Sequence, residues 1–228
     1  MLLSDELIYV GDLFVDKLWR VGEIMSPEFS FAMYGIGLNS YIDFGKPNES
    51  RVCDENCNQA PKEVVFGFND DFYWSTALQG IAFGNTEYNG FALDSPTQSY
   101  SYAIFDTGSP HLTLPDYIYD KVLNKLIEVS GEQVFYTKDG ITFVDCFQVG
   151  QMLPIYLMVN QHWLQVDPYD YVWDVENDGS TCILMMVQHK YDFFILGQPI
   201  FQGYYTHHNL DYVTIGFTPL VGSGKDLP

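Results

Sequence analysis

Short apolar runs bounded by turn-forming residues recur along the chain, and they constrain its fold more than any other feature. Each run is too short to form a stable helix by itself, and Gly, Pro, Asn or Asp separates it from the next run. Aromatic residues make up 17% of the 228 residues, which further favours strands. The pattern predicts a mostly β protein with few helices. The clearest runs in the second half are 141–146, 155–159, 171–175, 181–187, 192–197 and 212–217.

Two segments have helical rather than strand spacing. Residues 115–129 place apolar side chains on one helical face, between a Pro-Asp start and the glycine at 131. Residues 12–25 show a similar spacing, so we expect one longer and one shorter helix. The alternating, glycine-containing segment 29–45 predicts a hairpin or two strands, and residues 64–85 predict a strand, a turn and a second strand.

The charge of the chain is strongly acidic, with a formal net charge of −20. Nucleic acids and anionic membrane surfaces both need clustered Lys and Arg, so we exclude them as partners. The excess of carboxylates serves either solubility alone or life at acidic pH. We find no apolar window of about 18 residues and expect no membrane span. Asp5 and Glu6 interrupt the first apolar run, so we expect no signal peptide in this chain.

Four cysteines are present, at positions 53, 57, 146 and 182. An even number suits two disulfides in an oxidising compartment. The spacing of Cys53 and Cys57 also suits a metal, but zinc needs two more ligands and no His or Cys pair follows at finger spacing. We therefore favour disulfides and expect neither a metal nor a cofactor. The expectation of disulfides conflicts with the expectation of no signal peptide, because disulfides form in compartments that proteins usually reach with one. Either the cysteines are reduced, or the true N-terminus lies upstream of Met1.

The tetrapeptide Asp106-Thr107-Gly108-Ser109 places a carboxylate at the end of the apolar run 101–105. The glycine allows a sharp turn and a close approach of another backbone, and the two hydroxyls can hydrogen-bond to the loop. Two such carboxylates that face each other can share one proton, so that one acts as a base and the other as an acid. Alone, the tetrapeptide would be read as an Asp that caps a turn; the apolar run before it and the Pro-started helix after it favour chemistry.

In this context the sequence resembles the pepsin-type aspartic proteases of peptidase family A1, and specifically their C-terminal lobe. Residues 103–115 resemble the second active-site motif of that family. Residues 29–45 are similar to the strand pair that opens the C-terminal lobe, and residues 70–85 to the aromatic strand before the active site. Residues 193–217 are similar to the stretch with an apolar-apolar-Gly triplet and a final Ile-Gly-Phe.

The resemblance implies roles for the residues of the motif. Asp106 would be one catalytic carboxylate of an aspartic endopeptidase, which hydrolyses peptide bonds at acidic pH through an activated water. Thr107 would brace the loop against its counterpart on the other lobe, whereas Gly108 and Ser109 would shape the loop and its hydrogen bonds. Thr113 would lie near a substrate subsite.

The resemblance also implies the supporting structure. Ile195, Leu196 and Gly197 would cross under the active-site loop and brace it, and Cys146 and Cys182 would form the disulfide of the lobe. The implied fold is a mostly β, barrel-like acid-protease lobe with one or two short helices. A secreted, lysosomal or vacuolar location follows from the family.

The resemblance divides the chain into three parts. Residues 1–28 would be the remnant of an N-terminal lobe and the lobe junction, 29–220 the C-terminal lobe, and 221–228 a tail. The family carries one catalytic Asp on each lobe, and only one such motif occurs here, so the partner of Asp106 is expected on a missing N-terminal lobe. Two alternatives remain: a symmetric protease made of two copies, or a non-catalytic lobe that binds peptides or a partner protein.

Overall fold

The computed structural model describes most of the chain from residue 73 onward and shorter segments before it. The predicted helix at 12–25, both early cysteines and all but the last residue of the region 1–28 lie outside the described residues. The described residues are 28–32, 41–44, 47–48, 52, 64–67, 73–85, 91–92, 101–131, 134–176, 178–209, 211–225 and 227.

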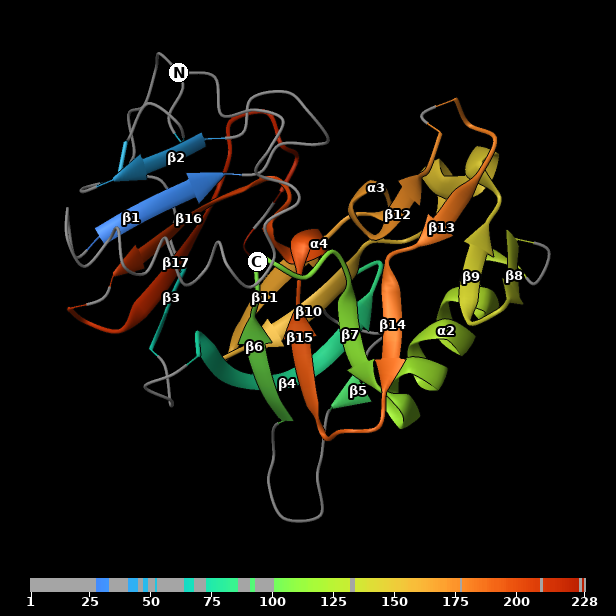
Figure 1. The fold of residues 1–228 in the computed structure, drawn as a ribbon, viewed down its shortest axis with the longest axis horizontal. Helices are drawn as coiled ribbons and strands as arrows, with labels where there is room; N and C mark the ends of the chain where they lie inside the picture. The colour runs from blue at the N-terminus through green and yellow to red at the C-terminus, as the bar shows by residue number, and fades with distance from the viewer. Residues whose placement is uncertain are drawn as a thin grey trace.

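Strands dominate the described residues, as predicted, and they form three sheets (Figure 1). The largest has the order β11-β10-β4-β6-β15-β7-β14, with β5 paired to β4. Within it β6 runs parallel to β15, and β7 runs parallel to β14 and antiparallel to β15. Its strands are β4 (Ser75–Phe83), β5 (Phe91–Ala92), β6 (Ser101–Phe105), β7 (Leu112–Pro115), β10 (Ile155–Val159), β11 (His162–Val166), β14 (Met186–His189) and β15 (Phe193–Leu196).

A five-stranded sheet lies at the left in Figure 1, in the order β2-β1-β16-β17-β3. Strands β1 and β2 pair antiparallel, in agreement with the hairpin or two strands predicted over 29–45. A four-stranded sheet in the order β12-β13-β9-β8 lies at the right. The strands of these two sheets are β1 (Glu28–Ala32), β2 (Tyr41–Phe44), β3 (Val64–Gly67), β16 (Tyr204–Asn209), β17 (Thr214–Pro219), β8 (Phe135–Lys138), β9 (Ile141–Val144), β12 (Val172–Asp174) and β13 (Cys182–Leu184).

The predicted helix at 115–129 forms as α2 (Asp116–Ser130). Its buried face consists of Ile118, Tyr119, Val122 and Leu126, and the amide of Gly131 closes its end by donating to the Ile127 carbonyl at 2.8 Å. Three short helical turns were not predicted: η4 (Cys146–Gln151), α3 (Pro168–Tyr171) and α4 (Gln198–Phe201). Each is too short to produce a helical period in the sequence.

Strand β7, which lies between the Asp-Thr-Gly-Ser tetrapeptide and the helix, was not predicted, and β11 and β8 were missed for different reasons. Strand β11 does not alternate, because Leu164, Gln165 and Val166 are all buried in succession. The polar Gln165 is tolerated because its amide N–H donates to the Tyr204 hydroxyl at 2.9 Å and its side chain donates to Asp167 at 2.7 Å. Strand β8 is mostly exposed and pairs with one neighbour only, so it lacks an apolar face that the sequence could reveal.

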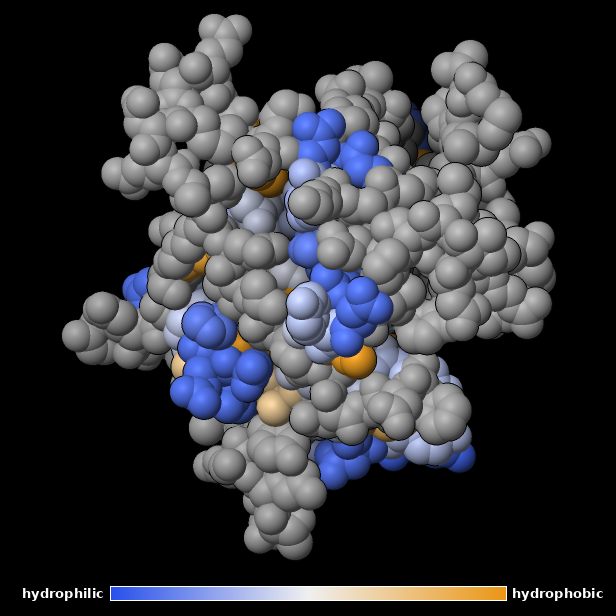
Figure 2. Space-filling view, turned by 90° about the vertical axis from the view of Figure 1, so that its left-hand side faces the viewer, coloured by the Kyte–Doolittle hydropathy of each residue, from blue (hydrophilic) through white to orange (hydrophobic). Residues whose placement is uncertain are grey.

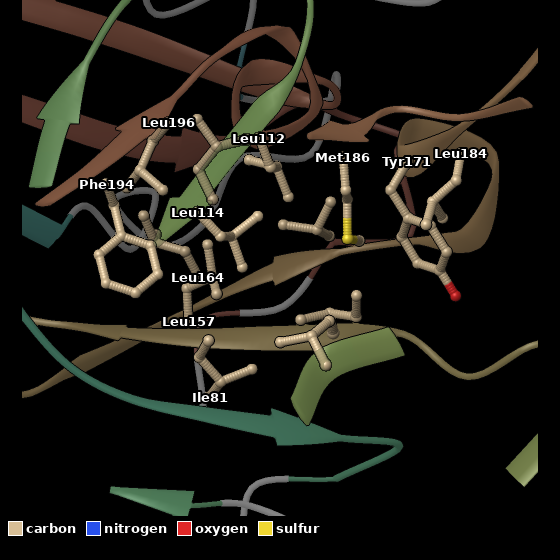
Figure 3. Close-up of a cluster of buried hydrophobic side chains, with 14 of the residues drawn as sticks. Ile81, Leu112, Leu114, Leu157, Leu164, Tyr171, Leu184, Met186, Phe194 and Leu196 are labelled. Atoms are coloured by element: carbon tan, nitrogen blue, oxygen red, sulfur yellow. The ribbon is translucent and has the colours of Figure 1, made fainter. Parts of the chain in front are cut away.

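The core lies beneath the parallel strands of the large sheet (Figure 3). Leu112 and Leu114 from β7 and Phe194 and Leu196 from β15 point toward β10 and β11, where they face Leu157. All five side chains are at most 4% exposed. Their close packing fixes the distance of β7 and β15 from β10 and β11, and therefore the position of the loops at the ends of β7 and β15.

The disulfide implied for Cys146 and Cys182 is present, and it joins η4 to β13 across 36 residues of sequence. It therefore anchors the four-stranded sheet to the helical turn that precedes β10. The other predicted cysteine pair, Cys53 and Cys57, falls outside the described residues.

Hydrophilic side chains predominate among the described residues on the face shown in Figure 2, where hydrophobic ones appear only as small, separate spots. Among the described residues we find no helix long and apolar enough to span a bilayer.

Strand β16 buries a histidine in the five-stranded sheet. His208 is 3% exposed, and the edge of its ring lies against Trp74, with the ring centroids 5.0 Å apart. Burial, with a smaller contribution from His207, lowers the pKa of His208 to about 3. Between about pH 6.5 and pH 3, His208 is therefore protonated in the unfolded chain but neutral in the folded chain. The free energy of unfolding falls as the pH falls through this window.

We therefore expect His208→Leu to flatten the acid side of the stability profile. Between pH 6 and pH 4 the free energy of unfolding of the wild type should fall more steeply than that of the variant, by about 1 kcal/mol per pH unit. Urea unfolding at a series of pH values measures both slopes. His162→Leu, which changes an exposed histidine, should keep the wild-type slope. Equal slopes for wild type and His208→Leu would contradict the prediction.

The turn between β16 and β17 holds a strained residue. Val213 has φ 51°, in the left-handed region that β-branched residues avoid, and it is 41% exposed. Because Asn accepts this conformation, Val213→Asn should raise the free energy of unfolding by about 1 kcal/mol. Val221→Asn is the matched control, since Val221 is a similarly exposed valine without a positive φ. Chemical denaturation of the three proteins measures the difference, and a loss of stability in Val213→Asn would refute the strain.

Candidate active site

Asp106 lies at the surface end of β6, directly after a core residue. Phe105 is 4% exposed and packs against Phe217, with ring centroids 5.2 Å apart, and against Phe201. Asp106 itself is half-buried, and its backbone N–H donates to the carbonyl of Leu196 in β15 at 3.0 Å. An aromatic anchor therefore fixes the strand, and the backbone of β15 fixes the point where the carboxylate leaves it.

The Asp106 loop, by which we mean residues 106–111, is closed by its own hydrogen bonds. The amide of Gly108 donates to Asp106 Oδ1 at 2.9 Å, which orients the carboxylate, and the amide of Ser109 donates to the Asp106 carbonyl at 3.2 Å. The Ser109 hydroxyl donates to the His111 carbonyl at 3.2 Å. The Gly108 amide thus orients the carboxylate, and the other two hydrogen bonds fix the backbone of the loop.

Strand β15 enters this loop from below. It lies between β6 and β7, with Ile195 opposite both Ile104 and Thr113. Beyond its end, the amide of Gly197 donates to the His111 carbonyl at 3.1 Å, and the amide of Gln198 donates to the Ser109 carbonyl at 2.8 Å. The three backbone hydrogen bonds donated by Asp106, Gly197 and Gln198 attach the end of β15 and the residues after it to the Asp106 loop.

A side chain at position 197 has no room. A Cβ built on Gly197 would lie 2.3 Å from both the Ser109 and the His111 carbonyl oxygens. These are backbone atoms, so they cannot swing aside as the end of a flexible side chain can. The close approach of the two backbones therefore requires glycine.

The structure brings most of the predicted site residues together. Asp106, Thr107, Gly108 and Ser109 lie in the Asp106 loop. Gly197 is hydrogen-bonded to this loop, and Ile195 and Leu196 lie on β15 beside it. Thr113 lies further along β7, half-buried. The Cys146–Cys182 disulfide belongs to a different sheet.

Sequence reasoning missed the part that His111 takes in this loop. Its carbonyl accepts hydrogen bonds from both the Ser109 hydroxyl and the Gly197 amide. Burial lowers the pKa of its half-buried imidazole. These contacts go to the backbone of His111, so no side-chain pattern in the sequence could have revealed them.

One group of possible metal ligands occurs among the described residues, formed by Cys146, Cys182 and Asp174, whose ligand atoms all lie within 4.8 Å of one another. Both sulfurs are bonded to each other in the disulfide, so neither is a thiolate ligand. We therefore take the Asp106 loop as the candidate active site, because it presents a partly accessible carboxylate oriented by the Gly108 amide.

A family model described as eukaryotic aspartyl protease matches residues 5–220. The match covers most of the chain, so the chain belongs to the eukaryotic aspartyl protease family, and the resemblance in its sequence is confirmed. The family makes it a protein of the aspartic peptidase kind. A search of curated proteins found no match.

We expect Gly197→Ala to destabilise the protein strongly. The added methyl group must push apart the backbone at Ser109 and His111, which should lower the free energy of unfolding by about 2–3 kcal/mol. Gly150→Ala is the matched control: a Cβ there meets only the hydroxyl end of Tyr169, an exposed side chain that can move, so the change should stay within about 0.5 kcal/mol. Urea unfolding measures both, and equal losses would contradict the packing argument.

Proposed function

We propose that this chain provides one half of the active site of an aspartic endopeptidase, with Asp106 as one member of a catalytic carboxylate pair. The observation that carries the proposal is the fixed Asp106 loop, whose carboxylate is oriented by the Gly108 amide and remains partly accessible. The family match supports the same reaction class. Peptides or proteins would be the substrate.

The proposed mechanism needs two carboxylates that share one proton. The ionised member takes a proton from a water molecule, and the water oxygen attacks the carbonyl carbon of the peptide bond. The protonated member gives its proton to the carbonyl oxygen, which yields a neutral tetrahedral intermediate. In the collapse, the carboxyl group that was ionised at the start gives its proton to the amide nitrogen, and the other carboxylate takes a proton from a hydroxyl of the intermediate. The C–N bond breaks, the amine leaves, and the pair again holds one proton. This cycle favours acidic pH, because the pair must retain a proton.

The second carboxylate is proposed to come from outside the described residues. Two Asp-Tyr-Val triplets occur elsewhere in the sequence, at 170–172 and 211–213, but neither has the glycine turn of the Asp-Thr-Gly-Ser motif. Asp170 lies in α3 and forms an ion pair with Lys225, and Asp211 is exposed in the turn between β16 and β17. Neither position suits a partner for Asp106, and we propose that a first lobe provides it.

The domain division is proposed on the same basis. Residues 29–220 form the C-terminal lobe of the enzyme, residues 1–28 belong to the first lobe and the lobe junction, and residues 221–228 form a tail. A secreted, lysosomal or vacuolar location fits the disulfide between Cys146 and Cys182, because such bonds persist in oxidising compartments.

Asp106→Asn tests the catalytic role. The variant keeps the size of the side chain but cannot act as a base, so peptide cleavage at acidic pH should fall by about a thousandfold or more. The measurement is the rate of cleavage of a denatured protein or a peptide mixture, followed by mass spectrometry, with the full protein as it occurs in its source. Asp120→Asn, on an exposed part of α2, should retain the wild-type rate. Undiminished cleavage by Asp106→Asn would refute the proposal.

The source of the second carboxylate is tested by varying the protein concentration. If the first lobe is part of the same assembly, the specific activity stays constant on dilution. If two copies pair around two Asp106 residues, the specific activity falls on dilution. If no assembly cleaves any peptide, the lobe is non-catalytic and the proposed function is wrong.

A further inference from the structure

A buried lysine that sequence reasoning did not single out holds a charged cluster at one end of the large sheet. The side chain of Lys225 is 2% exposed. Its ammonium group donates to Asp167 Oδ2 at 2.7 Å and also to Asp170 Oδ2. Asp167 immediately precedes α3 and Asp170 is its third residue, so one cation from the segment after β17 binds both the cap and the body of this short helix.

The site is built to receive the lysine. Gly203 has φ 76°, and a Cβ there would lie 2.8 Å from Lys225 Cε, so the glycine leaves space for the lysine stem. The ammonium group lies 5.8 Å from the ring centre of Tyr204, which provides a cation–π contact. The buried stem, the space beside it and the aromatic face all serve this one side chain.

The two carboxylates depend on the cation. The amide of Asp167 donates to Asp170 Oδ2 at 2.7 Å, so the two acidic residues are also joined directly. Burial raises the pKa of Asp170, and Lys225 opposes that shift. Without the lysine, two partly buried carboxylates would remain side by side without a counter-charge, which is among the more destabilising arrangements in a protein interior.

The charged cluster is connected to the Asp106 loop by two short helices. Helix α3 packs against α4, and both lie at the end of the sheet where β6 delivers Asp106 (Figure 1). Helix α4 begins immediately after Gly197, and its first residue, Gln198, donates to the Ser109 carbonyl. A displacement of α3 would therefore reach the loop through α4.

We propose that Lys225 is a positioning residue for the Asp106 loop. By binding Asp167 and Asp170, it holds α3 against α4. Helix α4 in turn holds Gly197 and Gln198, whose amides donate hydrogen bonds to the loop. The consequence for catalysis rests on the proposed function, but the consequence for the loop does not. Lys225 contacts Asp167, Asp170 and the ring of Tyr204, so it acts on the loop through other residues.

Two variants with matched controls test the proposal. Lys225→Met keeps the stem and removes the charge, and Lys125→Met is its control, because Lys125 forms only an exposed pair with Glu128 on α2. Gly203→Ala keeps every charge but pushes the stem aside. Gly140→Ala is its control, because Gly140 has a similar φ of 80° with nothing within 4 Å of the added methyl. Should Lys225→Met fail to fold, Gly203→Ala carries the test.

The first readout is hydrogen exchange of the Gly197 and Gln198 amides, which donate into the Asp106 loop. Under conditions where all variants are folded, we expect these amides to exchange at least about tenfold faster in Lys225→Met and Gly203→Ala than in their controls. Exchange within twofold of the controls would overturn the proposal, even if the melting temperature falls, because Lys225 would then stabilise only its own segment.

The second readout is peptide cleavage, and it separates the two proposals. Misplacement of a catalytic carboxylate lowers kcat, so kcat should fall by about ten- to a hundredfold with KM changed less than about twofold. An unchanged kcat would overturn a role in catalysis. If the wild type cleaves no peptide while the two amides respond as expected, the proposed function fails and the positioning of the loop by Lys225 stands.

Discussion

The Asp106 loop of this protein depends on one close approach between two backbones. Strand β15 ends at Leu196, and Gly197 then passes between the carbonyls of Ser109 and His111, where no Cβ fits. Three backbone hydrogen bonds across this crossing fix the loop that carries Asp106. The parallel pairing of β6 with β15 brings the two segments together, and the core beneath them sets their height. A carboxylate on such a support has little freedom, as preorganised catalysis requires.

Two buried ionisable groups elsewhere in the fold respond to pH in opposite ways. His208 is buried and stays neutral over the acidic range, so its burial opposes folding at low pH. Asp170 is partly buried but has a cation beside it, and its raised pKa has the opposite sign: the folded chain binds its proton more readily than the unfolded chain does, which adds stability as the pH falls. The two contributions to stability therefore oppose each other as the pH falls.

Membership of the eukaryotic aspartyl protease family and a single oriented carboxylate lead to the same requirement. Under the proposed function, one carboxyl group cannot be both the acid and the base of a single hydrolytic step, so the reaction calls for a second carboxyl group opposite Asp106. The surface of the loop, where Gly108 and Pro110 are exposed, is the place where a partner would have to approach.

The sequence by itself determined the β-rich character, the α2 helix and the Asp-Thr-Gly-Ser tetrapeptide, because hydrophobic periodicity and turn residues act over short distances. It did not reveal strand β11, whose consecutive buried residues hide a polar Gln165, or the short turns α3 and α4. Only the tertiary structure decided that Gly197 meets Ser109 and that Lys225 reaches Asp167. These contacts join residues 58 or more positions apart through backbone atoms and a buried cation, and no local pattern in a single sequence records such pairings.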